Sequence, residues 1–182
     1  MQFMKSKPNT ITSLLLFCSI VLLQISCGSS ENKTQEIEDS NTFNRPVYDV
    51  SNIDTSAPVV ELTVLAQGQD MSQMSFDMKS MEVSAGTTVK LIVKSTSPDA
   101  SMPHNWVLVH KGTMESVAKA GLDAGRDNGF VPNSPDVLVK SKLLGPNESD
   151  TIIFPAPPIG TYEFVCTYPG HWSIMNGTFT VK

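Results

Sequence analysis

The chain has 182 residues, enough for one ordinary domain and an additional segment at one end. About 40% of the residues are apolar and 17% are charged, within the range of a soluble globular protein. The formal net charge is −5, and no basic run is long enough to form a nucleic-acid surface. We therefore expect no nucleic-acid partner.

The first 26 residues have the features of a secretory signal peptide. Lys5 and Lys7 precede an apolar stretch from Ile11 to Ile25, which is shorter than the roughly 20 residues that a membrane-spanning helix needs. The stretch ends just before Cys27 and resembles the lipobox of bacterial lipoproteins, in which cleavage precedes a cysteine that is then diacylated. The sequence predicts an exported protein, anchored by lipid on Cys27 to a bacterial membrane and facing the periplasm or the cell exterior. The alternative is an ordinary cleaved signal followed by a coincidental cysteine.

Residues 27–57 are polar and rich in Ser, Asn, Asp, Glu and Thr, with no helical or alternating pattern. This composition predicts a disordered tether that begins with the lipidated cysteine. About 30 such residues span roughly 30 Å as a flexible chain and roughly 100 Å when fully stretched. The alternative is that part of the segment, from Phe43 to Val50, packs on the domain.

From residue 58 to residue 182 the pattern changes to short apolar runs separated by turn residues, which predicts one all-β domain, a sandwich or barrel. An alternating run at residues 74–78 continues at Met81 and Val83 with a change of phase, which predicts a β-bulge. Residues 114–124 have a helical pattern, with Val117, Ala118 and Leu122 as its apolar residues. The other predicted strands lie near residues 60–64, 89–93, 105–110, 137–144, 150–154, 162–166 and 177–182.

The predicted domain contains a single cysteine, Cys166, because Cys18 lies in the signal and Cys27 at its end. A lone thiol in an oxidising compartment is a liability unless it is buried, catalytic or bound to a metal. His171 and Met175 follow within ten residues of Cys166. The Pro-Gly pair before His171 lets the chain turn back toward the thiol, so the surroundings of Cys166 favour a metal.

A second imidazole lies upstream at His104, which completes a set of two imidazoles, one thiolate and one thioether. This set is typical of blue-copper electron-transfer sites, in which the thioether is a weak axial ligand. Zinc is the alternative, but structural zinc sites usually take a fourth Cys or His with regular spacings that this chain lacks. We therefore expect one copper ion that cycles between Cu(I) and Cu(II).

Residues 59–182 resemble the azurins, of the cupredoxin family. The resemblance rests on His-Asn-Trp-Val-Leu at 104–108, on Cys-Thr-Tyr-Pro-Gly-His at 166–171 and on a Cys-x4-His-x3-Met spacing that ends at Met175. It implies a cupredoxin Greek-key β-sandwich with one short helix outside the barrel. It also implies that His104, Cys166, His171 and Met175 bind the copper.

The resemblance further implies that Asn105 and Thr167 lie just outside the ligands, where Asn105 ties the two ligand segments together by hydrogen bonds. Azurins usually have glycine before the first histidine ligand, and its carbonyl is a long fifth contact to copper. Pro103 occupies that position here, so its carbonyl is the corresponding candidate. The azurin disulfide is missing, and Trp172 replaces a residue that is usually small.

Two other functions are weighed against electron transfer. An oxidase or reductase needs a second, His-rich copper centre, but His110 is the one remaining histidine, so we expect no enzyme. A tethered copper chaperone or store exposes methionines that exchange metal, and Met71, Met74, Met78 and Met81 form two Met-x-x-Met pairs. Because these methionines follow a strand pattern, we expect them in the core.

The residues around the predicted ligands form an apolar surface with no charged residue between positions 166 and 176. Such a surface on an acidic protein indicates a contact site for weak redox encounters. We expect a monomer whose electrons pass through His171 to partners such as cytochromes, a terminal oxidase, a nitrite reductase or a peroxidase. The alternative is that the aromatic residues only cover the copper. The predicted electron port comprises Met102, Tyr168, Pro169, Trp172 and Ile174.

Overall fold

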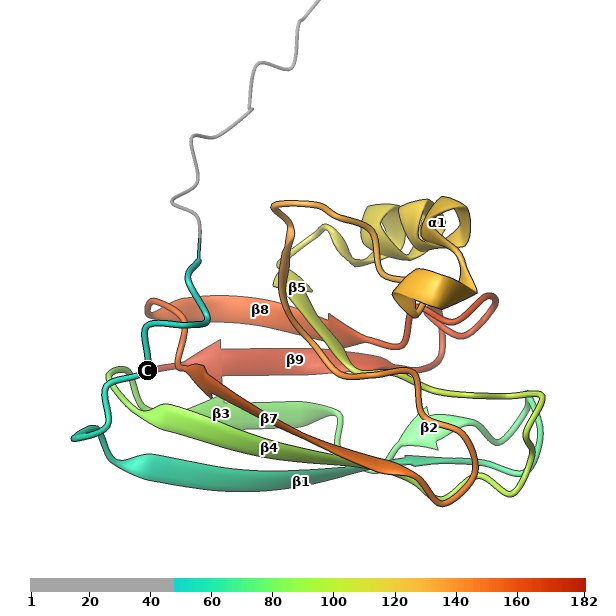
Figure 1. Cartoon of the computed structure of the whole chain (residues 1–182), viewed down its shortest axis with the longest axis horizontal. Coiled ribbons are helices and arrows are strands. Elements are labelled where there is room, and N and C mark those ends of the chain that lie inside the picture. The colour runs from blue at the N-terminus through green and yellow to red at the C-terminus, as the bar shows by residue number, and fades with distance from the viewer. Residues whose placement is uncertain (1–47) are drawn as a thin grey trace, which may run out of the picture. The chain divides into compact units, whose positions relative to one another are not determined.

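The computed structural model describes residues 48–182 (Figure 1). The predicted signal peptide, Cys27 and most of the predicted tether therefore lie outside the described residues. Within residues 48–182, no helix is long and apolar enough to cross a membrane.

In the described part of the chain, nine strands form two sheets, one of four strands in the order β2-β1-β4-β7 and one of five in the order β3-β9-β8-β5-β6. The two sheets face each other and do not close into a barrel, so the predicted all-β sandwich is confirmed (Figure 1). The first sheet contains β1 (Val59–Gln67), β2 (Ser75–Phe76), β4 (Thr88–Ser95) and β7 (Ser149–Pro155). The second contains β3 (Ser80–Val83), β5 (Val107–His110), β6 (Val137–Lys140), β8 (Gly160–Val165) and β9 (Asn176–Val181).

The predicted bulge between residues 74 and 83 is wrong. β2 pairs with β1 in the first sheet, whereas β3 pairs with β9 in the second, so the chain changes sheet between the two strands. The inward-facing side chains change phase because the partner sheet changes, and no extra residue is inserted into one strand. This crossing brings the segment between β1 and β3 next to the start of β9.

The core lies between the two sheets and is built from alternate residues of the strands. In β4, Val89, Leu91 and Val93 are fully buried, as the alternation in the sequence predicts. Trp106, which precedes β5, is also fully buried and stacks on Phe164 with ring centroids 5.7 Å apart. These side chains make one rigid support beneath the ends of β5 and β8.

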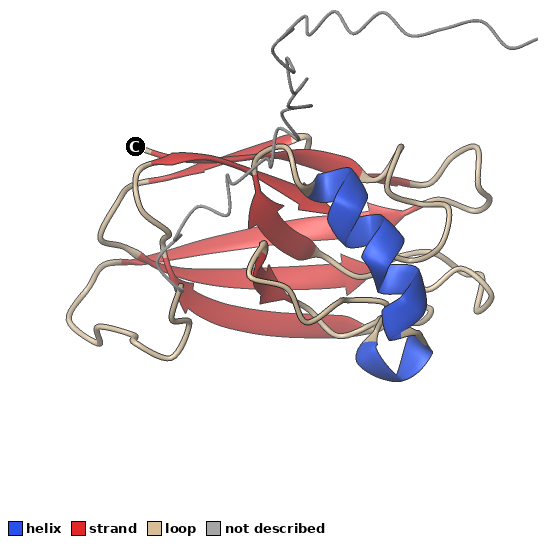
Figure 2. Ribbon diagram, turned by 90° about the horizontal axis from the view of Figure 1, so that it is seen from above, coloured by secondary structure: helices blue, strands red, loops and turns tan. Residues whose placement is uncertain are grey.

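Helix α1 (Met114–Ala124) has the predicted bounds and lies outside the sheets, between β5 and β6 in the sequence (Figure 2). Val117, Ala118 and Gly121 are its buried residues, and Val117 packs on outward-facing valines of β5 and β8. Leu122, the third apolar residue of the helical pattern, lies off this buried face and is 53% exposed. At 3.6 residues per turn, Leu122 lies about 90° around the helix from the centre of that face.

The described chain begins ten residues before the predicted start of the domain. Tyr48 is half-buried, packs against the core and donates a hydrogen bond from its hydroxyl to the carbonyl of Pro155 in β7. Burial raises the pKa of this hydroxyl above its ordinary value of 10.0. Tyr48 thus joins the domain, while the extent of the tether before it stays a prediction.

Candidate metal centre

One group of metal-binding side chains lies at the end of the sandwich where β5 begins and β8 ends. His104 comes just before β5, and Cys166 directly follows β8, which pairs with β5 through Val107 and Val165. His171 lies in the loop that connects β8 to β9. One ligand atom from each of His104, Cys166 and His171 lies within 4.8 Å of the other two, and all three residues are buried. Among residues 48–182, no other such group of His, Cys, Asp and Glu is found.

The loop from Cys166 to Met175 is closed by its own backbone. The Cys166 N–H donates to the Met175 carbonyl over 2.9 Å, and the Met175 N–H donates to the His171 carbonyl over 2.8 Å. Gly170, before His171, has a φ of +84°, a left-handed conformation that favours glycine. This turn directs His171 back toward Cys166, and the two side chains approach to 3.6 Å between Nδ1 and Sγ. Met175 is fully buried at the neck of the same loop.

His104 is held from the other side of the site by a single bridge to Leu144. The His104 N–H donates to the Leu144 carbonyl over 2.9 Å, and the reverse bond is 2.7 Å long. The strands predicted at residues 105–110 and 137–144 are therefore shorter, as β5 and β6, with this bridge beyond them. Pro103 is buried beside His104, and the role expected of its carbonyl stays a prediction.

Asn105 connects the segment of His104 to the segment of Cys166. Its Nδ2 donates to Oγ1 of Thr167 and to the carbonyl of Gly129, each over 2.7 Å, and its Oδ1 accepts from the Thr167 N–H over 2.8 Å. Both side chains are buried, so these hydrogen bonds do not compete with water. They fix the spacing of two chain segments that are 62 residues apart in the sequence.

Burial controls the electrostatics of the three side chains. It raises the pKa of the Cys166 thiol to about 11, against a smaller lowering by the backbone N–H groups of Asn105 and Tyr168. It lowers the pKa of His104 to about 4. The pKa of His171 is also about 4, because of burial and then of the neighbouring His104. The site thus favours neutral imidazoles, which have lone pairs available for a metal.

The donor set fits a copper ion. Neither ring nitrogen of His104 has a hydrogen-bond partner, although both are buried. An unsatisfied buried polar atom costs about 1–3 kcal/mol, so two of them on one ring need an explanation. A metal would explain the one nitrogen that it binds. A thiolate, two imidazoles and a thioether are soft and borderline ligands that suit copper.

The five residues of the predicted electron port differ in exposure. Ile174 is 44% exposed, Tyr168, Pro169 and Trp172 are half-buried, and Met102 is buried. Tyr168 lies against His171 with ring centroids 4.7 Å apart and donates from its hydroxyl to the Ser101 carbonyl. Trp172 packs against the outward-facing valines beneath α1.

Two residues next to the loop were missed by the sequence analysis. Met71 reaches Gly170, since a Cβ placed on that glycine would lie 3.5 Å from the Met71 methyl group. The Lys79 ammonium donates to the Ile174 carbonyl over 2.9 Å. No local signal marks either residue, because 95 positions separate Lys79 from Ile174. The loop is uncharged in its own sequence, but the fold supplies a cation to it.

The four methionines considered for copper exchange do not share an exposed face. Met74 and Met81 are buried in the core and Met78 packs against it, as expected. The expectation is wrong for Met71, which is 56% exposed. Their arrangement favours packing over a shared thioether site.

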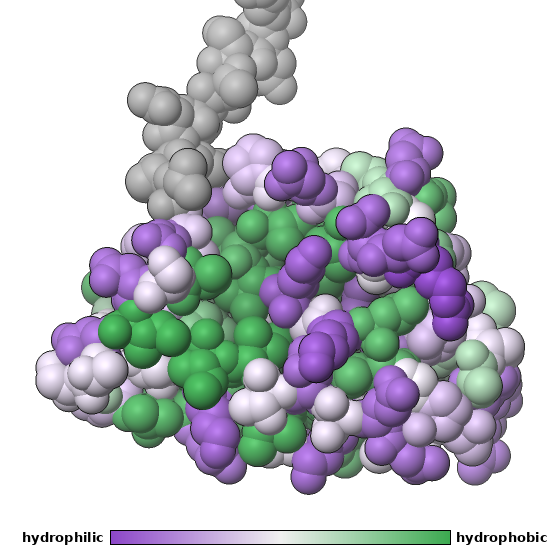
Figure 3. Space-filling view, in the orientation of Figure 1, coloured by the Kyte–Doolittle hydropathy of each residue, from purple (hydrophilic) through white to green (hydrophobic). Residues whose placement is uncertain are grey.

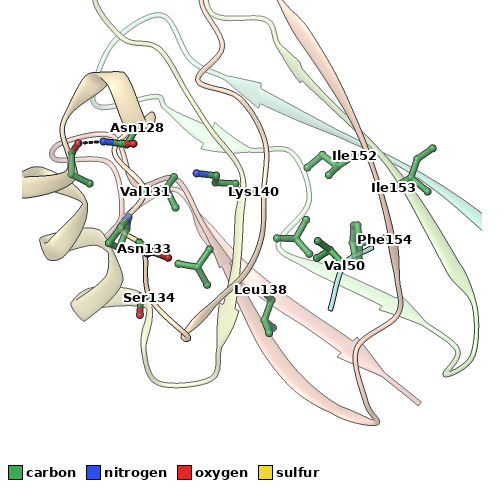
Figure 4. A pocket seen from close by; sticks show the side chains of 14 residues that line it. Val50, Asn128, Val131, Asn133, Ser134, Leu138, Lys140, Ile152, Ile153 and Phe154 are labelled. Carbon is green, nitrogen blue, oxygen red and sulfur yellow. Dashed lines mark hydrogen bonds between the residues drawn. The ribbon is translucent and has the colours of Figure 1, made fainter. Parts of the chain in front are cut away.

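A groove of about 710 Å³ lies away from the candidate site, between the edge strands β6 and β7. Figure 3 shows hydrophobic surface on the face over which β7 runs. In Figure 4, apolar side chains of β7 lie on one side of the groove, and residues that follow α1 lie on the other. No His or Cys lines the groove, so it offers no metal chemistry.

Comparison with known proteins agrees with this geometry. Residues 62–182 match the family model described as copper-binding proteins of the plastocyanin/azurin family. The chain is 39% identical over 132 residues to azurin from Bordetella pertussis, covering 68% of this chain and 87% of that protein. It is 38% identical over 118 residues to auracyanin-A from Chloroflexus aurantiacus, covering 63% of this chain and 72% of the relative.

Solved structures show the same similarity. The structure of auracyanin A, a blue copper protein of Chloroflexus aurantiacus, matches with a TM-score of 0.61 at 35% identity, over 68% of this chain and 99% of that one. Auracyanin B matches with a TM-score of 0.62 at 32% identity, over 73% of this chain and 96% of that one.

Proposed function

Since the chain belongs to the plastocyanin/azurin family of copper-binding proteins, we propose that it is a blue-copper electron carrier that passes single electrons between redox partners outside the cytoplasm. The observation that carries this proposal is the buried group of His104, Cys166 and His171, together with the unsatisfied ring nitrogens of His104. Copper bound there would accept and release one electron between Cu(II) and Cu(I).

In this proposal His104, Cys166 and His171 would hold the copper most strongly, and the Met175 thioether would be a weaker ligand. The protein's part is to hold these side chains in place, so that little has to move when the charge changes. Asn105 and the backbone bonds within the ligand loop supply that rigidity. The Pro103 carbonyl is a candidate for a further weak contact. Burial of all four side chains keeps water from the site.

We infer that the protein is a carrier rather than an enzyme. The chain has three histidines, two of which belong to the candidate site, so His110 alone is left for a second centre. In this proposal the buried Met175 would also take a ligand position that a substrate would otherwise need. A copper chaperone is disfavoured because Met74 and Met81 pack into the core.

The proposed location is a bacterial membrane surface, in the periplasm or at the cell exterior, with the lipid on Cys27. Figure 1 supports a specific presentation of the site: the segment from Tyr48 to β1 lies at the same end of the sandwich as the C-terminus, whereas the loop between β8 and β9 lies at the opposite end. The chain thus enters the domain at the end opposite the candidate site. Cytochromes, a terminal oxidase, a nitrite reductase and a peroxidase are the proposed partners, met by a monomer through the apolar residues around His171.

An absorption spectrum tests the copper assignment. The purified protein with Cu(II) should have an intense visible band from thiolate-to-copper charge transfer that bleaches with ascorbate, and Cys166→Ser should abolish it. A colourless copper complex, or a band that persists in Cys166→Ser, would contradict the proposal. A redox titration beside a copper-transfer assay separates the carrier from a chaperone, which would give up its metal readily to an acceptor.

Cell fractionation tests the anchor. Wild-type protein should sediment with membranes, and Cys27→Ala should release it or block its maturation, because the apolar signal is too short to anchor it stably. Wild-type protein that is soluble and lacks an acylated amino terminus would exclude lipidation.

A further inference from the structure

The segment between β1 and β3 touches the ligand loop at two separate points. Near its start, the methyl group of Met71 lies against Gly170, the residue before His171. At its end, the Lys79 ammonium lies 2.9 Å from the Ile174 carbonyl and 3.4 Å from the Asn176 carbonyl. One segment thus contacts both the His171 arm and the Met175 arm of the loop.

The backbone of Lys79 is held in place, so its exposed side chain starts from a fixed position beside the ligand loop. Its carbonyl accepts a hydrogen bond from the Thr178 N–H over 2.9 Å, next to the parallel pairing of β3 with β9. The chain passes so close at Gly177 that a Cβ there would lie 2.6 Å from the Lys79 carbonyl oxygen. Lys79 is therefore fixed beside the start of β9, and its side chain turns back over the end of the loop.

The two carbonyls that accept from Lys79 belong to the residues on either side of Met175. The N–H and the carbonyl of Met175 itself are already paired within the loop, with His171 and Cys166. The hydrogen bonds of Lys79 hold the flanking peptide groups at Ile174 and Asn176. Together these bonds leave the backbone around the Met175 side chain little freedom.

Met71 contacts the other arm of the loop from a tight turn. Asp70 caps this turn by accepting from the Ser72 N–H at its Oδ1 over 2.8 Å and from the Met74 N–H at its carbonyl over 3.1 Å. Met74 enters the core, whereas Met71 is 56% exposed and its methyl group lies beside Gly170, which is also exposed. Gly170 has no side chain of its own to shield the turn before His171.

We propose that Lys79 and Met71 are positioning residues that clasp the ligand loop from outside, Lys79 acting on the Met175 arm and Met71 on the His171 arm. The role of this clasp rests on the proposed copper function, because the two residues would position the ligands Met175 and His171. Its mechanical part, the restraint on the loop backbone, is a property of the chain whether or not copper is bound. This difference allows the clasp and the proposed function to be tested separately.

Hydrogen exchange measures the restraint at Lys79. In the full chain, Lys79→Met removes the ammonium and keeps most of the side chain, while Lys79→Arg keeps the charge and the donors. The Lys79→Met change should accelerate exchange of the Ile174 and Met175 amides about fivefold, both with copper and without it. Lys182→Met is the matched control, because Lys182 is also exposed and paired, with Glu82, at the opposite end of β9. The control should leave both amides unchanged, and Lys79→Arg should restore most of the protection.

The visible spectrum gives a second readout for Lys79. If Lys79 positions Met175, Lys79→Met should change the relative intensities of the copper bands, which respond to the axial sulfur, and Lys79→Arg should return them toward wild type. Unchanged amides and an unchanged spectrum in Lys79→Met would overturn the assignment. Equal acceleration at amides throughout the domain would also overturn it, because that result reports global destabilisation. A wild-type protein without a blue band would refute the proposed function, but the exchange comparison would still decide the clasp.

Met71→Ala tests the other arm. The His171 amide, which donates to the Tyr168 carbonyl over 3.0 Å, should exchange about threefold faster when the contact of Met71 beside Gly170 is lost. Ile159→Ala is the control, since Ile159 is an exposed apolar residue of the turn before β8, away from the loop. An unchanged His171 amide in Met71→Ala would remove Met71 from the clasp.

Discussion

Replacement of Asn105 by alanine tests how much of the site's rigidity comes from one buried side chain. The change removes three hydrogen bonds, of 2.7, 2.7 and 2.8 Å, to Thr167 and Gly129. At about 1 kcal/mol for each neutral bond, the free energy of unfolding should fall by about 3 kcal/mol, roughly a hundredfold in the unfolding equilibrium. The buried N–H of Thr167 also loses its acceptor, and this unsatisfied donor sets a lower limit to the loss of unfolding free energy.

Urea unfolding of the copper-free protein in the presence of a reductant, followed by tryptophan fluorescence, measures this loss without linkage to metal binding. Asn128→Ala is the matched control, because Asn128 makes one exposed hydrogen bond, to the Ala124 carbonyl. The control should cost at most about 1 kcal/mol. With copper bound, Asn105→Ala should also release the metal faster than wild type. A loss of less than about 1 kcal/mol, or one no larger than the control's, would refute the view that Asn105 holds the two ligand segments together.

Three further predictions address the surface, the helix and the amino-terminal segment. Ile174→Lys should slow electron self-exchange at least about tenfold while the blue band survives, because a small apolar interface then has to bury an ammonium. The same change at the distant, exposed Ile159 should leave the self-exchange rate unchanged. Equal rates in the two variants would place the electron port elsewhere. Val117→Ala should cost about 2 kcal/mol of unfolding free energy in urea titrations and Leu122→Ala within about 0.5, because only Val117 is buried; similar losses would contradict the orientation of α1. Tyr48 has a raised pKa in the folded state, so as pH rises the unfolded chain loses this proton at a lower pH than the folded chain does. The free energy of unfolding should therefore fall as pH rises above about 10, and Tyr48→Phe should flatten that fall in thermal melts between pH 10 and 11. An unaltered slope would contradict the packing of this residue.

The types of ligand in the candidate site can be read from the chain alone. Cys166, His171 and Met175 lie in one short loop, so their spacing is visible in the chain and needs no long-range information. The strands and the helix were also predictable, because alternation and helical periodicity reflect which side chains face a core. Fold class, helix bounds and the copper family follow from such local patterns.

The distant segments that meet around that loop are visible in the folded chain and not in its sequence. The change of sheet between β2 and β3 looked like a bulge in the sequence, because a phase change has the same pattern whether one residue is inserted or the partner sheet changes. That crossing carries Lys79 to Ile174, across 95 residues. Leu122 matched the helical period but stayed exposed, since the close approach of the chain at Gly121 sets which side of α1 faces the sheet. Contacts of this kind depend on how whole elements pack, and no local run of residues encodes them.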